Sequence, residues 1–280
     1  MDSSLRHLLV HLDGAPGAEP RLLLARRLAA EHGAAVTAMF ATVPAAMMIP
    51  YAPDLGGLAV DTLVNLDEQR RIAARQAFDK VLGQQPGVNV RWASISDLGA
   101  PLIFARQALF ADLVVLGQHD PTHAGLGGAP PQFTETVVSR SGRAALVVPY
   151  TGDVPDRFDT VLVAWKDTPE AARAVAAAIP LLQRARRVHV LAWDWHAAEV
   201  EGGALDPVQY LRTHGIDSQW HDEGAEPHDV GEQILSRASD MGAQLLVMGA
   251  YGHSRAREWV LGGATRTMLQ SMTLPVLMAH

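Results

Sequence analysis

Short apolar runs alternate with longer stretches of helical spacing along the chain. The run at residues 8–12 is followed by a stretch rich in Ala, Leu and Arg at residues 21–32, and then by a second apolar run at residues 35–40. Apolar runs that are bounded by glycine or proline and separated by helical patterns indicate β-α-β units and a parallel sheet. The run at residues 113–116 is apolar throughout, as is typical of strands buried on both faces.

The same pattern occurs twice. The apolar run that starts at position 8 returns at position 161, and a helical stretch at residues 170–182 follows it. The run that ends in Gly117 likewise matches a later run that ends in Gly249. Such self-similarity is typical of tandem copies of one structural unit.

Each copy closes on an apolar strand, at residues 145–149 in the first copy and at residues 275–279 in the second. The first copy is longer, because it carries an insert at residues 44–83. Within this insert, residues 61–82 are rich in Arg, Ala, Glu and Gln, which predicts a helix.

Turn-forming residues at 150–158 separate the two copies. We therefore predict an α/β chain of two tandem, open, doubly wound parallel-sheet domains. The first domain is expected at residues 1–150 and the second at residues 157–280.

Composition and charge narrow the function. The chain has 280 residues, a formal net charge of -7 and no cysteine. The absence of cysteine excludes disulfides, thiolate metal sites and a cysteine nucleophile, and the negative charge argues against a nucleic-acid binder. The start lacks the pattern of a signal peptide, and no run approaches the ~18 apolar residues of a membrane helix. A cytoplasmic protein that does not bind a membrane is expected.

Two pairs of glycines mark the predicted site. Gly249 and Gly252 follow a predicted strand, and ligands of open parallel sheets bind beyond the carboxyl ends of strands. Gly262 and Gly263 precede a predicted helix at residues 264–271, whose free N–H groups and positive dipole end suit phosphate. From the residues alone, phosphate binding and ordinary glycine turns both stay open.

The spacing of these glycines resembles the universal stress protein family. Its nucleotide-binding members carry Gly-x-x-Gly, nine residues and Gly-Ser/Thr after the fourth strand. Here Gly249 and Gly252, then residues 253–261, then Gly262 match that spacing. The resemblance covers the chain as a tandem pair and is closer in the second half. It implies a Rossmann-like fold of the adenine nucleotide alpha hydrolase-like type and ATP as the ligand.

The resemblance also implies which residues form the site. In ATP-binding members the glycines and the helix N-terminus hold the phosphates and ribose, and Met248 and Ala192 correspond to residues that line the base. The predicted nucleotide site therefore consists of Lys166, Ala192, Met248, Gly249, Gly252, Gly262, Gly263, Ala264 and Thr265.

Two of these positions depart from the family pattern. Gly263 stands where the family has Ser or Thr, which keeps an N–H group but removes a hydroxyl and predicts weaker phosphate binding. Lys166 stands where the family has an acidic residue that contacts adenine. Lys166 either pairs with Asp167, the next residue, or reaches a phosphate group.

The first half keeps less of the pattern. Asp13 resembles the acidic residue of the first strand, but Asp120 takes the place of the second glycine. Pro130 and Pro131 stand near the expected helix start, and proline lacks the N–H group that a phosphate would need. A second nucleotide site is therefore not expected.

Other candidate groups favour ordinary structure. His119, Asp120 and His123 have side chains that suit zinc, but their loose spacing favours a polar loop, and no metal site is predicted. Trp193 and Trp195 either wall a pocket or pack beneath the next helix, and we favour packing. No Ser/His/Asp elbow, Walker lysine motif or paired-carboxylate signature is found, so no catalytic residue is predicted.

The resemblance thus implies a stress-response regulatory protein that binds an adenine nucleotide, ATP, in its second half and is not an enzyme. Two alternatives stay open, namely an interaction scaffold whose two sites have both decayed and a slow ATP hydrolase. As in family dimers, the last strands of the two copies, near Val147 and Leu277, are expected to pair. This pairing predicts an intrachain pseudo-dimer and leaves open a further homodimer.

Overall fold

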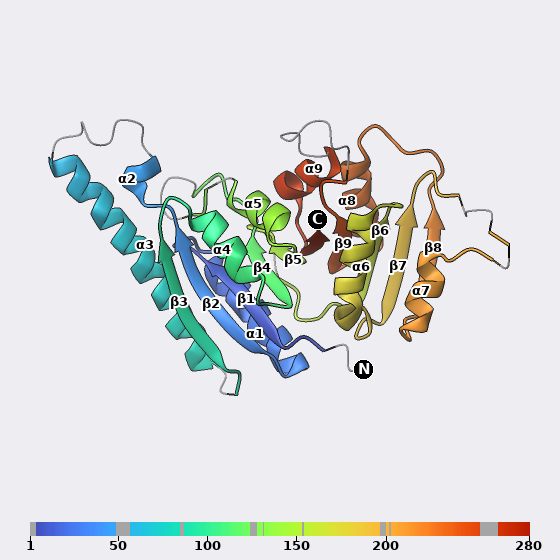
Figure 1. The fold of residues 1–280 in the computed structure, drawn as a ribbon, viewed down its shortest axis with the longest axis horizontal. Coiled ribbons are helices and arrows are strands. Elements are labelled where there is room, and N and C mark those ends of the chain that lie inside the picture. Colours follow the sequence, from blue (N-terminus) through green and yellow to red (C-terminus); the bar gives the residue numbers. More distant parts are fainter. Residues whose placement is uncertain are drawn as a thin grey trace. The chain divides into compact units, whose positions relative to one another are not determined.

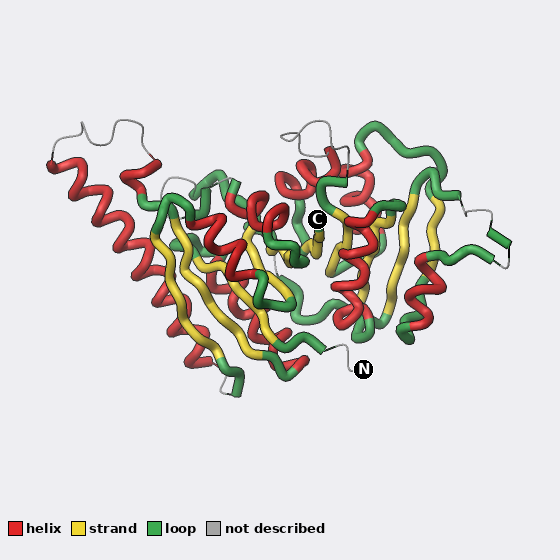
Figure 2. Tube along the Cα trace, in the orientation of Figure 1, coloured by secondary structure: helices red, strands yellow, loops and turns green. Residues whose placement is uncertain are grey.

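The computed structural model describes residues 4–48, 57–84, 87–123, 128–130, 132–152, 154–196, 200–201, 203–252 and 263–280. The chain forms two compact units, Ser4–Arg143 and Ala144–His280, which we call the amino-terminal and carboxyl-terminal units. Each unit is built on a sheet with helices on both faces (Figure 1), and the alternation of strand and helix along the chain is visible in Figure 2.

The amino-terminal unit has a parallel sheet with the strand order β3-β2-β1-β4. Its strands are β1 (His7–Leu12), β2 (Ala35–Thr42), β3 (Val90–Ser96) and β4 (Leu113–Gly117). Its helices are α1 (Ala18–His32), α2 (Ala45–Met48), α3 (Gly57–Gln84), α4 (Ala100–Ala108) and α5 (Phe133–Arg140). Helices α1 and α3 pack together on one face, and α4 and α5 pack together on the other (Figure 1).

The carboxyl-terminal unit has the strand order β5-β10-β9-β6-β7-β8. Its strands are β5 (Ala145–Val148), β6 (Thr160–Trp165), β7 (Arg187–Ala192), β8 (Gln219–Asp222), β9 (Leu245–Gly249) and β10 (Val276–Ala279). Its helices are α6 (Pro169–Leu182), α7 (Pro207–Thr213), α8 (Val230–Asp240) and α9 (Gly263–Ser271). Within this order, the neighbouring strands β10, β9, β6, β7 and β8 all pair in parallel.

Strand β5 pairs with β10 in antiparallel register, with Val147 opposite Val276 and Leu146 opposite Leu277. This confirms the prediction that the last strands of the two sequence copies pair. Because of this pairing, β5 belongs to the carboxyl-terminal unit although its sequence ends the first copy.

The predicted fold class is confirmed. Residues 113–116 form most of β4 and are at most 1% exposed, as expected for a strand covered on both faces. Helix α3 lies in the predicted insert, and α6 and α9 begin within one residue of their predicted positions. Within the described residues, every helix is too short or too polar to cross a membrane.

Candidate functional site

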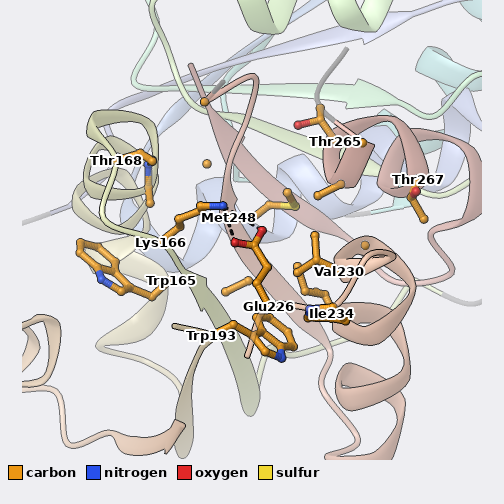
Figure 3. A pocket seen from close by; sticks show the side chains of 18 of the residues that line it. Trp165, Lys166, Thr168, Trp193, Glu226, Val230, Ile234, Met248, Thr265 and Thr267 are labelled. Carbon is orange, nitrogen blue, oxygen red and sulfur yellow. Dashed lines mark hydrogen bonds and ion pairs between the residues drawn. The ribbon is translucent and has the colours of Figure 1, made fainter. Parts of the chain in front are cut away.

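A cavity of about 460 Å³ lies at the carboxyl ends of β6 and β9. The strand order reverses at this point, because β6 lies between β7 and β9, and open α/β sheets bind ligands there. The walls come from the end of β6, the start of α6, the segments after β7 and β8, and the start of α9 (Figure 3). The volume is within the range of small-molecule sites.

The cavity brings most of the predicted residues together. Its lining includes Lys166, Met248, Gly249, Gly252, Gly263, Ala264 and Thr265. Ala192 is buried at the end of β7, and the residue that follows it, Trp193, lines the cavity. Gly262 lies outside the described residues.

Gly249 allows the backbones of β9 and α6 to come close together. A Cβ atom placed on it would lie 2.6 Å from the backbone nitrogen of Ala171. Helix α6 begins here because the Thr168 hydroxyl oxygen accepts a hydrogen bond from that N–H group at 3.2 Å and Pro169 provides the first helical residue. Gly263 differs, because a Cβ atom placed on it would meet no atom within 4 Å.

The segment after β9 is tied to α9. Tyr251 has a φ of 64°, which is uncommon for a residue other than glycine. Its N–H group donates a hydrogen bond to Thr265 Oγ1 at 3.2 Å, and Thr265 is buried. This bond holds the turn at residues 249–252 beside the N-terminus of α9, so that both border the same end of the cavity.

An ion pair lies in the middle of the cavity. Lys166 Nζ is 2.8 Å from each carboxylate oxygen of Glu226, which belongs to the segment between β8 and α8. Figure 3 shows the two charged groups meeting between Trp193 on one side and Thr265 on the other. The side chains are 45% and 34% exposed, so the pair is open to water and to a ligand.

Glu226 was not among the residues predicted from the sequence. Asp167 was one predicted partner of Lys166, whereas in the structure Asp167 Oδ1 accepts a hydrogen bond from Trp165 Nε1 at 2.8 Å. Glu226 lies 60 residues from Lys166 along the chain, and no spacing rule relates the two. The available signal, an acidic residue shortly after a strand, could not be used, because the strand that precedes it, β8, was not predicted either.

The opposite end of the cavity is apolar. Trp193, Val230 and Ile234 line it, whereas Met248 lies beside Lys166 (Figure 3). Trp193 thus walls the cavity, contrary to the interpretation that we favoured from the sequence. Trp195 packs edge-on against Trp220 of β8, with ring centroids 4.8 Å apart.

The corresponding place in the amino-terminal unit is filled by its own side chains. Arg21 Nη2 lies 3.0 Å from Asp13 Oδ1, and the two side chains are only 3% and 8% exposed. A Cβ atom placed on Gly117 would lie 2.5 Å from Arg21 Nη1. The guanidinium group therefore lies at the end of β4. In the carboxyl-terminal unit the equivalent strand is β9, whose end leads into the turn at residues 249–252.

His11 completes this buried cluster. A carbonyl only accepts and a guanidinium only donates, so His11 Nε2 donates to the Ala41 carbonyl at 2.9 Å and Nδ1 accepts from Arg21 Nη1 at 3.2 Å. The ring stacks on Phe133 with centroids 4.0 Å apart. Burial lowers the pKa of His11 from 6.5 to about 4, and Arg21 acts in the same direction against the opposing effect of Asp13. His11 is therefore neutral at pH 7.

The polar residues after β4 bond to one another. Asp120 Oδ2 lies 2.7 Å from His123 Nδ1, and the Thr122 hydroxyl donates to Asp120 Oδ1 at 2.6 Å. Burial raises the pKa of Asp120, but these hydrogen bonds outweigh it and lower the pKa below its usual value. In the part of the chain that the structure describes, no three His, Asp or Glu side chains cluster in a way that could hold a metal ion.

The fold and the cavity define a tandem α/β protein of the doubly wound class with a candidate ligand site at a strand-order reversal. Residues 157–280 match the model of the universal stress protein family, so they form a universal stress protein domain. None of the curated proteins compared with the chain is significantly similar to it.

Solved structures extend the likeness over the whole chain. A universal stress protein from Archaeoglobus fulgidus is 14% identical with a TM-score of 0.65, and the match covers 97% of this chain and 94% of that one. A putative universal stress protein from Pseudomonas aeruginosa is 16% identical with a TM-score of 0.56, and the match covers 98% and 93% of the two chains. The chain therefore has the fold of tandem universal stress proteins.

Proposed function

We propose that the chain is a stress-response regulatory protein that binds a nucleotide, with ATP as the first candidate, in the cavity of its carboxyl-terminal unit. It acts by binding rather than by catalysis, and the location that we propose is the cytoplasm. The observation that carries the proposal is the pairing of two chemically different ends in one cavity. The turn at residues 249–252 and the start of α9 border one end, and apolar side chains border the other.

The first end suits phosphate groups. Helix α9 has nine residues and begins at Gly263, where the absence of a side chain leaves the free N–H groups accessible. These groups and the helix dipole favour an anion. Lys166 adds a positive charge within reach of the same space.

The second end suits a nucleobase. Trp193 offers a large aromatic face, and Ile234 and Val230 add apolar contacts at this end, while Met248 lines the cavity beside Lys166 (Figure 3). Stacking on an aromatic side chain is favourable for any base. An adenine nucleotide thus matches the cavity in volume and in the order of its chemical groups.

We further propose, from the pairing of β5 with β10, that the two sequence copies assemble as an intrachain pseudo-dimer. In this arrangement the first copy serves as a structural partner. The nucleotide site belongs to the second copy alone, because Arg21 fills the equivalent place in the first.

Calorimetric titration of the full chain with ATP and a non-hydrolysable analogue tests the proposal. The substitution Gly252→Val should abolish binding without unfolding the protein, because a Cβ atom at Gly252 meets only side-chain atoms, at 3.4 Å or more. Gly252→Ala is the matched control and should retain most of the affinity.

No binding at about 1 mM ATP would overturn the nucleotide proposal and leave the scaffold alternative. Phosphate release from ATP at the background rate is expected. A rate that is above background in the wild type and absent in Gly252→Val would instead establish the hydrolase alternative.

A further inference from the structure

We propose that Glu226 recognises the ribose of the bound nucleotide, so that the site selects ribonucleotides over 2′-deoxyribonucleotides. This inference rests on the nucleotide site proposed above and assigns a specificity-determining residue to it. Neither the sequence pattern nor the family resemblance pointed to Glu226.

Glu226 lies between the two ends of the cavity. A nucleotide that stacks its base on Trp193 and directs its phosphates to Gly263 must place its sugar between these two ends. The carboxylate of Glu226 occupies that middle position, where it meets Lys166 (Figure 3). The sugar therefore lies beside the ion pair.

The carboxylate of Glu226 suits the hydroxyl groups of a ribose. An ionised carboxylate only accepts hydrogen bonds and has about four lone-pair positions on its two oxygens. Lys166 Nζ contacts both oxygens at 2.8 Å, and the Glu226 side chain, which lines the cavity, is still 34% exposed. The 2′- and 3′-hydroxyl groups of ribose are two neighbouring donors, and a carboxylate can accept from both. Removing the 2′-hydroxyl removes one of these bonds.

The segment that carries Glu226 is fixed before any ligand binds. The Glu226 N–H group donates to Asp194 Oδ2 at 2.9 Å, and the Asp194 N–H group donates to the Gly224 carbonyl at 2.7 Å. The Glu223 N–H group donates to the Ala192 carbonyl at 3.0 Å. These bonds join the segment after β8 to the end of β7. With Lys166 they hold the carboxylate in place, and preorganised groups bind a ligand at lower entropic cost.

Comparison of ATP with 2′-deoxy-ATP by calorimetry tests the inference. In the wild type, ATP should bind at least about tenfold more tightly, because hydrogen bonds to charged groups contribute about 1.5–3 kcal/mol and 1.4 kcal/mol is tenfold. In Glu226→Gln, which offers one uncharged acceptor, the affinity ratio should fall below about threefold. Glu232→Gln removes the same charge from an exposed position on α8 and should keep the wild-type ratio.

The affinity ratio isolates contact with the sugar, since a general loss of structure or charge changes the affinity for both nucleotides alike. Equal affinities in the wild type would overturn the inference and leave the nucleotide site standing. A large affinity ratio that persists in Glu226→Gln would also overturn it, because a group other than Glu226 would then contact the 2′-hydroxyl. If neither nucleotide binds, the proposed function fails and this inference fails with it. The wild-type comparison remains decisive even if the variant does not fold.

Discussion

Acidification from pH 7 to pH 5 should destabilise the amino-terminal unit, because His11 cannot take up a proton in its buried position. The pKa of His11 is about 4 in the folded chain and 6.5 as the ordinary value. Between these values the unfolded chain binds the proton and the folded chain does not. The free energy of unfolding therefore falls as the pH falls from about 6.5 to about 4, and no further loss from His11 follows below that.

The folded and ordinary pKa values of His11 together determine how much stability is lost on acidification. At pH 5 the linkage removes about 2 kcal/mol of stability relative to pH 7, and about 3 kcal/mol is lost once the pH is below both pKa values. The contacts of His11 explain why its ring stays unprotonated in the folded chain. His11 Nδ1 faces the Arg21 guanidinium at 3.2 Å, so a proton on Nδ1 would break this hydrogen bond and place two cations together.

The assay is urea denaturation at pH 7, 6 and 5 for the wild type and for His11→Gln. The Gln amide can donate to the Ala41 carbonyl and accept from Arg21, but it has no titrating group and no ring to stack on Phe133. The variant should be less stable at pH 7, and its disadvantage should shrink by about 2 kcal/mol at pH 5. All other side chains are the same in the two proteins, so their contributions cancel in the difference. An NMR titration in which the His11 ring protonates near pH 6.5, or a constant difference between the two proteins from pH 7 to 5, would refute the reasoning.

Three substitutions test the cavity. Gly249→Ala should destabilise the chain by about 1–3 kcal/mol in denaturation experiments, because its Cβ atom would lie 2.6 Å from the Ala171 nitrogen. Gly263→Ala should change stability by less than about 1 kcal/mol, since its Cβ atom meets no atom within 4 Å, and equal losses in the two variants would contradict this distinction. Ala264→Phe should fill the cavity and abolish ATP binding in calorimetry while the circular dichroism spectrum stays that of the wild type. Retained affinity would show that the nucleotide binds elsewhere.

The fold could be predicted from the sequence because the strands are covered on both faces. Residues 113–116 and residues 161–163 are at most 1% exposed, so each had to be an uninterrupted apolar run. Gly249 could be singled out because it directly follows an apolar run, and the structure adds the reason for a glycine there, its close approach to the backbone of α6. Both features leave a local mark in the sequence, an unbroken apolar run or a glycine directly after one.

Glu226 and Trp193 could not be assigned in this way. The partner of Glu226 lies 60 residues away, and the contact exists only because β6 and β8 end at the same edge of the sheet. The sequence context of Trp193 favoured packing, and only the side-chain direction after β7 shows that it lines the cavity. The chemistry in the middle of the cavity thus depends on tertiary structure, which local patterns do not encode.

The buried side chains that fill the strand ends of the amino-terminal unit can be compared with the aligned residues of the second sequence copy. Matching position 8 with position 161 aligns β1 with β6, and matching the buried threonines Thr134 and Thr265 aligns α5 with α9. These alignments pair His11 with Ala164, Arg21 with Ala174, and Phe133 with Ala264. Three large side chains in the first copy therefore correspond to three alanines in the second.

This exchange accounts for the difference between the two units. His11, Arg21 and Phe133 are at most 2% exposed and satisfy one another through stacking and a hydrogen bond, so they occupy the space at the strand ends. Ala164 and Ala264 line the cavity, where their methyl groups leave that space open. Because the strand and helix pattern is shared, the difference between a filled and an open space at the strand ends lies in side-chain volume. The ligand site of the second copy thus depends on what these alanines lack as much as on what the glycines and Lys166 provide.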